Sequence, residues 1–149
     1  MKKAKVAVIG AGSAGMSAYR AIKRGGESCF LIENYLYGTT CARTGCMPSK
    51  LLIASANARH DVERAEKLGI DVEGVKVNRS SVMRRVRQER ERFVNFVIDD
   101  VHDFPEEDRL QGEYYFVDNH TMMTESGEKI EAEYFVIATG TKPYIPPIF

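Results

Sequence analysis

Apolar and polar residues fall into blocks along the first part of the chain, and the blocks predict a strand, a helix and a second strand. Residues 5–9 are a short, β-branched apolar run, which is typical of a strand buried on both faces. Residues 28–32 form a second apolar run. Between them, apolar positions in residues 16–22 recur at helical spacing, and Gly25-Gly26 ends that helix. The order strand, helix, strand predicts a βαβ unit with a parallel sheet.

Two long helices are predicted in the middle of the chain. Residues 48–68 fit a helix with one buried apolar stripe, formed by Leu51, Leu52, Ala54, Ala56 and Ala58. A polar stretch at residues 69–78 connects it to a second helix, residues 80–103, with apolar positions at Val82, Met83, Val86, Phe93, Val94, Val97, Ile98 and Val101. The arginine-rich run at residues 84–92 is interpreted as a solvated face of this helix rather than a nucleic-acid patch.

The pattern changes after Pro105. Three short runs predict antiparallel strands, at residues 114–117, 121–124 and 129–132, with a turn at Ser126-Gly127. Residues 134–138 predict another buried parallel strand. The predicted fold class is therefore α/β, with a central parallel sheet, flanking helices and a small antiparallel β-meander.

Charge and length narrow the classes of function. The 149 residues have the size of one ordinary domain, and 21 Lys plus Arg balance 21 Asp plus Glu. A net charge of zero argues against nucleic acid or an anionic membrane as a partner. The basic Lys2-Lys3 start resembles a signal peptide, but the apolar run after it is too short for one. No stretch approaches the ~18 apolar residues of a membrane span. We expect a cytoplasmic protein.

A glycine motif follows the first predicted strand. Gly10 permits a tight turn, Gly12 lets backbone approach a pyrophosphate, and Gly15 allows close packing of helix on strand. The diphosphate then lies at the helix N-terminus, where N–H groups and the helix dipole favour an anion. Glu33, at the end of the second strand, suits a ribose hydroxyl pair. The motif predicts a Rossmann-like dinucleotide site, and by itself leaves open FAD or NAD, as well as a plain glycine-rich turn.

Cys41 and Cys46 lie close together in a chain that has three cysteines. Gly45 can bend the backbone enough for the two sulfurs to meet, which a regular helix does not allow. Pro48 suits the first turn of a helix, so Cys46 is expected at or just before a helix N-terminus, where the dipole favours a thiolate. The segment predicts an activated cysteine beside a partner that can close a small, reducible ring.

Other interpretations of the cysteines are weaker. Half of a metal site is disfavoured because no nearby Cys or His completes a tetrahedral set, so no metal is predicted. A thioredoxin-like motif has two residues between its cysteines, whereas this pair has a longer spacing. Two inert thiols remain a third alternative. Cys29 lies in an apolar strand and is expected in the core.

With both motifs identified, the chain resembles the pyridine nucleotide–disulfide oxidoreductase family, whose members include dihydrolipoamide dehydrogenase, glutathione reductase and mercuric reductase. The resemblance rests on the glycine motif, on Glu33, on the cysteine signature at residues 38–50 and on the Ala138-Thr139-Gly140 turn. It implies FAD as cofactor and NAD(H) or NADP(H) as co-substrate. It also implies that residues 1–149 are the N-terminal segment of an FAD-binding domain, without the nicotinamide-binding and dimerisation domains, and inactive alone.

The resemblance assigns roles to residues. Cys41 becomes the interchange thiol that meets the substrate disulfide, and Cys46 becomes the thiolate that faces the flavin. The cofactor-binding residues that it implies are Gly10, Gly12, Ser13, Ala14, Gly15, Glu33, Asn34, Gly38, Thr39, Thr40, Lys50, Tyr114, Thr139 and Gly140. Electrons would pass between reduced nicotinamide, flavin, the cysteine pair and a disulfide. The implied protein is a homodimer.

The chain departs from the family signature at two places. Thr39 stands where the family usually has glycine, and its side chain is expected to change the local fit to the cofactor. Ala42-Arg43-Thr44 replaces the usual Leu-Asn-Val, and Arg43 is expected to stabilise a thiolate, meet an anionic substrate or point to water. Ser49, in Pro-Ser-Lys, is more similar to dihydrolipoamide dehydrogenase or mercuric reductase than to glutathione reductase.

The leading hypothesis is therefore a dihydrolipoamide dehydrogenase-like enzyme that acts on a lipoamide-like disulfide. Within the same family, a glutathione- or mercuric-reductase-like member is the alternative. A hypothesis of a different class is a non-catalytic, nucleotide-binding redox sensor.

Overall fold

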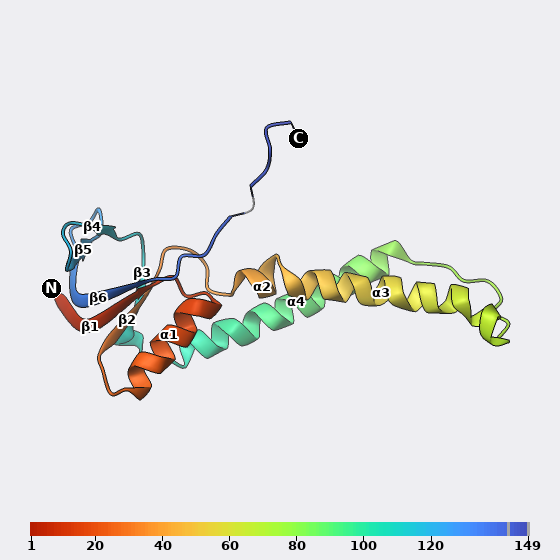
Figure 1. The fold of residues 1–149 in the computed structure, drawn as a ribbon, viewed down its shortest axis with the longest axis horizontal. Helices are drawn as coiled ribbons and strands as arrows, with labels where there is room; N and C mark the ends of the chain where they lie inside the picture. Colours follow the sequence, from red (N-terminus) through yellow and green to blue (C-terminus); the bar gives the residue numbers. More distant parts are fainter. Residues whose placement is uncertain (143, 149) are drawn as a thin grey trace. The chain divides into compact units, whose positions relative to one another are not determined.

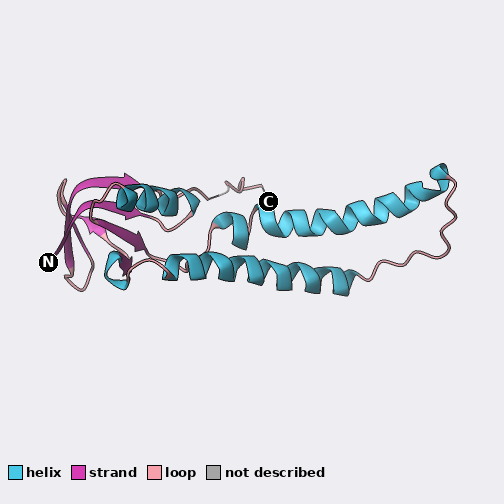
Figure 2. Ribbon diagram, turned by 90° about the horizontal axis from the view of Figure 1, so that it is seen from below, coloured by secondary structure: helices cyan, strands magenta, loops and turns pink. Residues whose placement is uncertain are grey.

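The structure is a computed structural model, and it describes residues 1–142 and 144–148. The chain forms two compact units. Residues 1–37 and the residues from 98 onward make the first, which we call the sheet unit. Residues 38–97 make the second, the helical unit. Figures 1 and 2 show the strands gathered in the sheet unit, and the mixed composition confirms the predicted α/β class.

The sheet has six strands in the order β3-β2-β1-β6-β5-β4. Their bounds are β1 Lys2–Ile9, β2 Cys29–Glu33, β3 Arg109–Gln111, β4 Tyr115–Phe116, β5 Thr121–Met123 and β6 Lys129–Ile137. The pairs β3–β2, β2–β1 and β1–β6 are parallel, while β4, β5 and β6 pair antiparallel at one edge. The predicted central parallel sheet with a small antiparallel meander is confirmed.

Both faces of the parallel part are buried, because successive side chains of a strand point to opposite faces. Val8 and Leu31 are paired in register and fully buried, and Val8 lies beside the first turn of α1 Ser13–Arg24. The other face carries the core cluster of Ala7, Phe30, Ile32, Leu110, Met122, Ile130 and Ala132. The prediction that residues 5–9 form a strand buried on both faces is thus confirmed at Ala7 and Val8.

The separate strands predicted at residues 129–132 and 134–138 are wrong, because both runs belong to the single strand β6. Its first three residues pair with β5 on one side, and nearly its whole length pairs with β1 on the other. The second half is also not fully buried, since Tyr134 is 62% and Ile137 is 71% exposed.

The four-residue helix α2 Thr40–Arg43 and two elements of the sheet unit were missed from the sequence. The strand β3 is short and polar at both ends, so it carries no alternating signal, and it pairs with β2. The 3-10 helix η2 Glu106–Asp108 precedes it. Together, η2 and β3 return the chain to the sheet after the residues of the helical unit.

The helical unit contains α2 Thr40–Arg43, α3 Cys46–Ala65, η1 Glu66–Leu68 and most of α4 Arg79–His102. In Figure 2, α3 and α4 run antiparallel, and the residues between them connect the end of α3 to the start of α4. Arg85 of α4 donates hydrogen bonds to the Leu51 carbonyl (2.5 Å) and the Ser55 hydroxyl (3.0 Å) of α3. The arginine-rich run is otherwise mostly exposed, as predicted.

The buried stripe predicted for residues 48–68 is wrong. No residue of α3 is fully buried, and Leu52 and Ile53 are 46% and 54% exposed. On α4, by contrast, Val86 and Val94 are buried as predicted. A helix with one helical neighbour covers only part of its surface, which leaves the apolar residues of α3 open to solvent. No helix in the part of the chain that the structure describes is long and apolar enough to cross a membrane.

Candidate functional site

The glycine loop joins β1 to α1, and two of its glycines have no room for a side chain. Gly10 has φ +105°, and a Cβ there would lie 2.4 Å from the Ala138 carbonyl oxygen. A Cβ on Gly15 would lie 1.7 Å from the Gly10 carbonyl oxygen. The tight turn predicted at Gly10 and the close packing predicted at Gly15 are therefore visible in the geometry.

Gly12 differs from these two glycines, because a Cβ there would meet no atom within 4 Å. Gly12 is the N-cap of α1 and has extended backbone, and no side chain caps this helix end. Ser13 and Ala14 form the exposed first turn. The open space at Gly12 faces backbone N–H groups and the positive end of the helix dipole, which is the environment that a diphosphate requires.

Glu33 ends β2, and backbone amides hold both of its carboxylate oxygens. The Ala11 amide donates to one oxygen at 2.9 Å, and the Tyr35 amide donates to the other at 3.0 Å. A carboxylate offers about four acceptor positions, so it retains capacity for ribose hydroxyls. The bond from Ala11 fixes the carboxylate beside the glycine loop, a link that the sequence did not reveal.

The chain returns to the glycine loop after β6. The Ala138 amide donates to the Ile9 carbonyl at 2.8 Å, and the Cα of Thr139 would lie 3.1 Å from a Cβ on Gly10. Thr139 and Gly140 are exposed. Tyr114 packs against the core cluster on the meander side, and burial raises the pKa of its hydroxyl to about 12. Asn34 is exposed directly after β2.

Cys41 and Cys46 lie on either side of a sharp bend in the helical unit. Cys41 belongs to α2, and Cys46 is the first residue of α3, with Gly45 as its N-cap. A Cβ on Gly45 would lie 3.0 Å from the Thr40 carbonyl oxygen and 3.2 Å from the Cα of Cys41. The predicted bend at Gly45 and the predicted place of Cys46 at a helix start agree with this geometry.

The cysteines differ in exposure. Both Cys41 and Cys46 are free thiols in the structure, the first half-buried and the second exposed. Cys29 is buried in β2, and burial raises the pKa of its thiol to about 11. The expectation that Cys29 belongs to the core is therefore confirmed.

Thr39 and Arg43, at the two departures from the family signature, lie at the start and the end of α2. The buried Thr39 side chain is the N-cap of α2 and accepts a hydrogen bond from the Ala42 amide at 3.2 Å. A Cβ on Gly38, which has φ +107°, would lie 2.8 Å from Nε of Arg43. The Arg43 side chain thus folds back over Gly38. Thr40 and Lys50 are exposed on α2 and α3.

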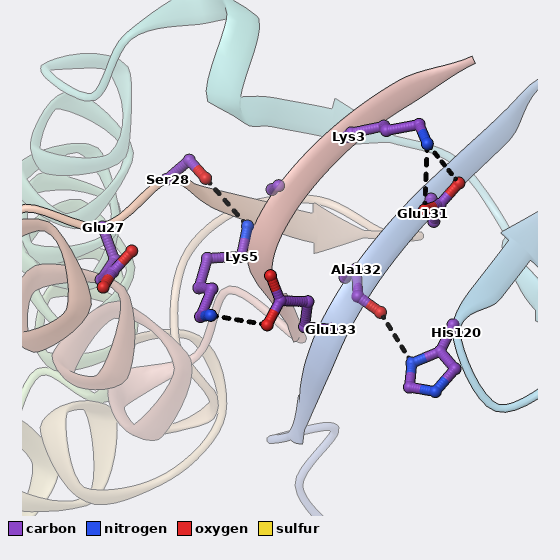
Figure 3. A pocket seen from close by; sticks show the side chains of 9 residues that line it. Lys3, Lys5, Glu27, Ser28, His120, Glu131, Ala132 and Glu133 are labelled. Atoms are coloured by element: carbon purple, nitrogen blue, oxygen red, sulfur yellow. Dashed lines mark hydrogen bonds and ion pairs between the residues drawn. The ribbon is translucent and has the colours of Figure 1, made fainter.

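A groove of about 550 Å³ lies at the start of β1 and β6, the opposite end of β1 from the glycine loop. Figure 3 shows that its charged side chains face one another, with Lys3 on Glu131 (2.9 Å) and Lys5 on Glu133 (2.5 Å). These ion pairs neutralise four of the charged side chains that line the groove. Within residues 1–142 and 144–148, no group of three or more His, Cys, Asp or Glu side chains is placed to hold a metal ion.

The chain is similar to known proteins over nearly its whole length. It is 28% identical to dihydrolipoyl dehydrogenase of Staphylococcus aureus over 95% of this chain, and 32% identical to mercuric reductase of Lysinibacillus sphaericus over 95%. It resembles the structure of a Cu(II) complex of the HOCl-induced flavoprotein disulfide reductase RclA from Escherichia coli, with a TM-score of 0.71 and 26% identity over 99% of this chain. The chain spans 31%, 26% and 31% of these relatives, respectively.

The family model described as pyridine nucleotide-disulphide oxidoreductase matches residues 4–149. Proteins of this family use FAD and NAD(P)H, in agreement with the cofactors that the sequence predicts. The glycine loop, the held carboxylate, the cysteine bend and this match lead to one conclusion: the chain belongs to the pyridine nucleotide–disulphide oxidoreductase family.

Proposed function

We propose that residues 1–149 are the N-terminal, FAD-binding segment of an oxidoreductase in which Cys41 and Cys46 carry electrons between NAD(P)H, FAD and a disulfide substrate. The observation that carries the proposal is the bend at Gly45, which sets Cys46 at the start of the 20-residue helix α3 with the backbone of Cys41 against it. A thiol at a helix N-terminus beside a second thiol is suited to reversible disulfide chemistry.

The sheet unit supplies the residues that would hold the adenosine and diphosphate end of FAD. Gly12, Ser13 and Ala14 offer an uncapped helix start with open space in front of it. Gly10 and Gly15 shape the turn around that space and belong to the same cofactor-binding set, and the Glu33 carboxylate is held for a ribose. We further assign Asn34, Tyr114, Thr139 and Gly140 to cofactor contact.

The helical unit supplies the residues that would lie along the diphosphate and the flavin. We assign Gly38, Thr40 and Lys50 to this role. Thr39 would contribute through its backbone, because its side chain is buried as the cap of α2. The side chain that replaces glycine therefore points into the protein, which explains how the chain tolerates threonine there.

The cysteine pair would act as a two-electron relay. Reduction of a Cys41–Cys46 disulfide breaks one S–S bond and takes up two electrons and two protons to give two thiols. We assign Cys41 to exchange with the substrate disulfide and Cys46 to the flavin. The bound FAD supplies the hydride chemistry that connects the pair to NAD(P)H.

A lipoamide-like disulfide is the substrate that we favour, and a homodimer is the assembly. The support is the similarity to dihydrolipoyl dehydrogenase and the Pro-Ser-Lys triplet at the helix start of Cys46. The test is the absorbance spectrum of the full-length protein, oxidised and then reduced anaerobically with NADH or NADPH. We expect a bound-flavin spectrum that gains a long-wavelength band on reduction.

Loss of that band in Cys46→Ser, with flavin retained, would assign the thiolate. Alkylation of Cys41 should then abolish lipoamide turnover while flavin reduction by NAD(P)H persists. Turnover that survives alkylation would refute the relay. A folded protein without flavin would refute the cofactor assignment.

A metal ion is a second candidate for the electron acceptor. Two relatives point to it, a mercuric reductase and a reductase whose structure is a Cu(II) complex. Rates of NAD(P)H oxidation with lipoamide, Hg(II) or Cu(II) as acceptor would separate the candidates. A rate with either metal ion well above that with lipoamide would move the assignment from a disulfide to a metal substrate.

A further inference from the structure

Arg43 lies in the cysteine bend, and the relay described above gives it no role. It is the last residue of α2, and its guanidinium lies over the backbone of Gly38, two residues before that helix begins. A Cβ on Gly38 would lie 2.8 Å from Nε of Arg43 and 3.2 Å from both Cζ and one terminal nitrogen. The guanidinium therefore packs where a side chain at position 38 would lie. We call this contact the clamp.

The clamp lies on a different side of α2 from the reactive thiol. Cys41 and Arg43 are two positions apart on this helix, and residues at that spacing do not face each other. The Arg43 side chain turns back toward the residues before the helix. Any effect of the clamp on Cys41 is therefore expected to pass through the backbone of α2.

Both ends of α2 are restrained by the residues that precede it. At the start, the Thr39 hydroxyl accepts a hydrogen bond from the Ala42 amide. At the end, the Arg43 amide donates to the Thr39 carbonyl at 3.0 Å, and the Arg43 side chain covers Gly38. A helix of four residues needs such contacts, because it makes too few hydrogen bonds to be stable alone. The two departures from the family signature therefore act on the same short helix.

We propose that Arg43 is a positioning residue, whose guanidinium clamps α2 on Gly38 and keeps Cys41 within reach of Cys46 while their disulfide is open. A thiol that explores fewer positions has a higher effective concentration toward its partner thiol. The clamp thereby stabilises the Cys41–Cys46 disulfide against reduction. This inference rests on the proposed function, because the stability of that disulfide matters only to a disulfide relay.

The test is the thiol–disulfide equilibrium of the full-length protein with glutathione, measured with FAD in excess. In the forward direction, the S–S bond of glutathione disulfide breaks and the Cys41–Cys46 bond forms. Two electrons and two protons pass from the protein thiols to two glutathione thiols. Rapid alkylation and mass spectrometry give the oxidised fraction at each glutathione ratio. We expect Arg43→Ala to lower the equilibrium constant for disulfide formation severalfold.

A substitution on the other side of the contact provides a second measurement. Gly38→Ala places a Cβ 2.8 Å from Nε of Arg43, so it should displace the guanidinium and lower the same equilibrium constant. In the Arg43→Ala background, Gly38→Ala should have a much smaller effect, because no guanidinium remains to be displaced. The strain of alanine at φ +107° is present in both backgrounds and cancels in the comparison. Equal effects in the two backgrounds would overturn the clamp.

Two further variants separate packing from charge. Arg43→Lys keeps the positive charge without the planar guanidinium, so its equilibrium constant should stay close to that of Arg43→Ala. Full recovery with lysine would assign the effect to charge and overturn the clamp. The matched control is Arg59→Ala, which removes an arginine paired with Glu63 on α3, about 20 Å of helix rise from Cys46. It should leave the equilibrium constant unchanged.

The remaining outcomes distinguish the clamp from substrate recognition and from the proposed function. An unchanged equilibrium constant in Arg43→Ala, with a higher KM for the carboxylate lipoate but not for neutral lipoamide, would make Arg43 a substrate-binding residue and overturn the clamp. An unchanged constant without any change in KM would overturn the clamp alone. A flavin-containing parent protein that forms no Cys41–Cys46 disulfide at any glutathione ratio would refute the relay, and the clamp with it. Circular dichroism reports that each variant is folded.

Discussion

At the scale of single residues, the three glycines of the loop after β1 have different structural roles. Gly10 and Gly15 are required by the protein itself, because backbone atoms occupy the places of their missing side chains. Gly12 has open space at its Cβ position, so the protein alone does not require glycine there. Under the proposed function, the requirement at Gly12 comes from a diphosphate that approaches the backbone.

This difference predicts that alanine at position 15 mainly lowers the free energy of unfolding, whereas alanine at position 12 mainly weakens flavin binding. Gly15→Ala should lower the free energy of unfolding by at least ~3 kcal/mol, because its Cβ would lie 1.7 Å from a carbonyl oxygen. Gly12→Ala should change it by less than ~1 kcal/mol and weaken flavin binding. Denaturant titration and the flavin-to-protein absorbance ratio measure the two effects. A Gly12→Ala protein that keeps its full flavin content would contradict the diphosphate assignment.

Cys29 makes a prediction about pH. Burial raises the pKa of its thiol from 9.0 to about 11, so the folded chain holds a proton that the unfolded chain loses between these values. The stabilisation is complete below pH 9 and is lost as the pH rises through 11. The loss should amount to ~2–3 kcal/mol, at 1.36 kcal/mol per pKa unit.

The comparison is between the parent protein and Cys29→Ala. Because tyrosines also ionise in this range, only the difference between the two pH profiles is diagnostic. We expect Cys29→Ala to have a lower free energy of unfolding than the parent protein at pH 8. The difference between the two proteins should be smaller at pH 11. Parallel profiles in urea titrations would show that Cys29 is not the titrating group.

At the scale of elements, the cysteine bend depends on a helix of four residues, α2. So short a helix is not stable on its own, and its ends decide whether it forms. Thr39 caps its start, and Gly45 lies against its first residue. The position of Cys41 therefore depends on Thr39 and Gly45, which are not themselves reactive.

Removing the cap should loosen the bend. Thr39→Ala should cost ~1 kcal/mol in unfolding free energy, whereas Thr39→Ser keeps the hydroxyl and should cost much less. Because Cys41 is half-buried in α2, its alkylation rate should rise in the alanine variant and stay near the parent value in the serine variant. Equal rates in the two variants, read by mass spectrometry, would show that the cap does not hold the helix.

At the scale of the whole chain, the sheet unit is closed by contacts between residues far apart in sequence. The Tyr19 hydroxyl of α1 donates to the Asp108 carboxylate at 2.6 Å, and Lys23 of the same helix lies 2.8 Å from it. The Phe104 ring packs on Tyr19 with centroids 4.4 Å apart. Asp108 is buried, so this cluster ties the chain that returns from the helical unit to the first helix.

Breaking the cluster should be costly. Asp108→Ala leaves a buried hydroxyl and an ammonium without their acceptor, and should cost ~3 kcal/mol in unfolding free energy. Tyr19→Phe should cost ~1 kcal/mol, and the double variant less than the sum because the two residues share one hydrogen bond. The control is Glu131→Ala, which removes an exposed ion pair with Lys3 and should cost ~0–1 kcal/mol. Additive losses in denaturant titrations would argue against the bond.

The sequence alone determined the features that depend on neighbours along the chain. The βαβ unit, the glycine turn, the helix start at Cys46 and the bend at Gly45 follow from local periodicity and from the backbone freedom of glycine. The position of Glu33 at the end of the second strand was also predicted correctly. The apolar run stops there, so the strand ends and the acid can face the glycine loop. These signals lie within a few residues of the structures that they specify.

Only the tertiary structure decided what depends on distant partners. The apolar run of β6 gave no sign that β1 would span both of its halves, and β3 is too short and polar to show a strand period. The side chain of Thr39 was expected to change the local fit to the cofactor, and only the structure shows that it is buried and accepts a hydrogen bond from the Ala42 amide. Similarly, the spacing of apolar residues on α3 predicts a stripe, but whether a stripe is buried depends on what packs against it. Burial and pairing are properties of two surfaces, and a sequence pattern describes only one of them.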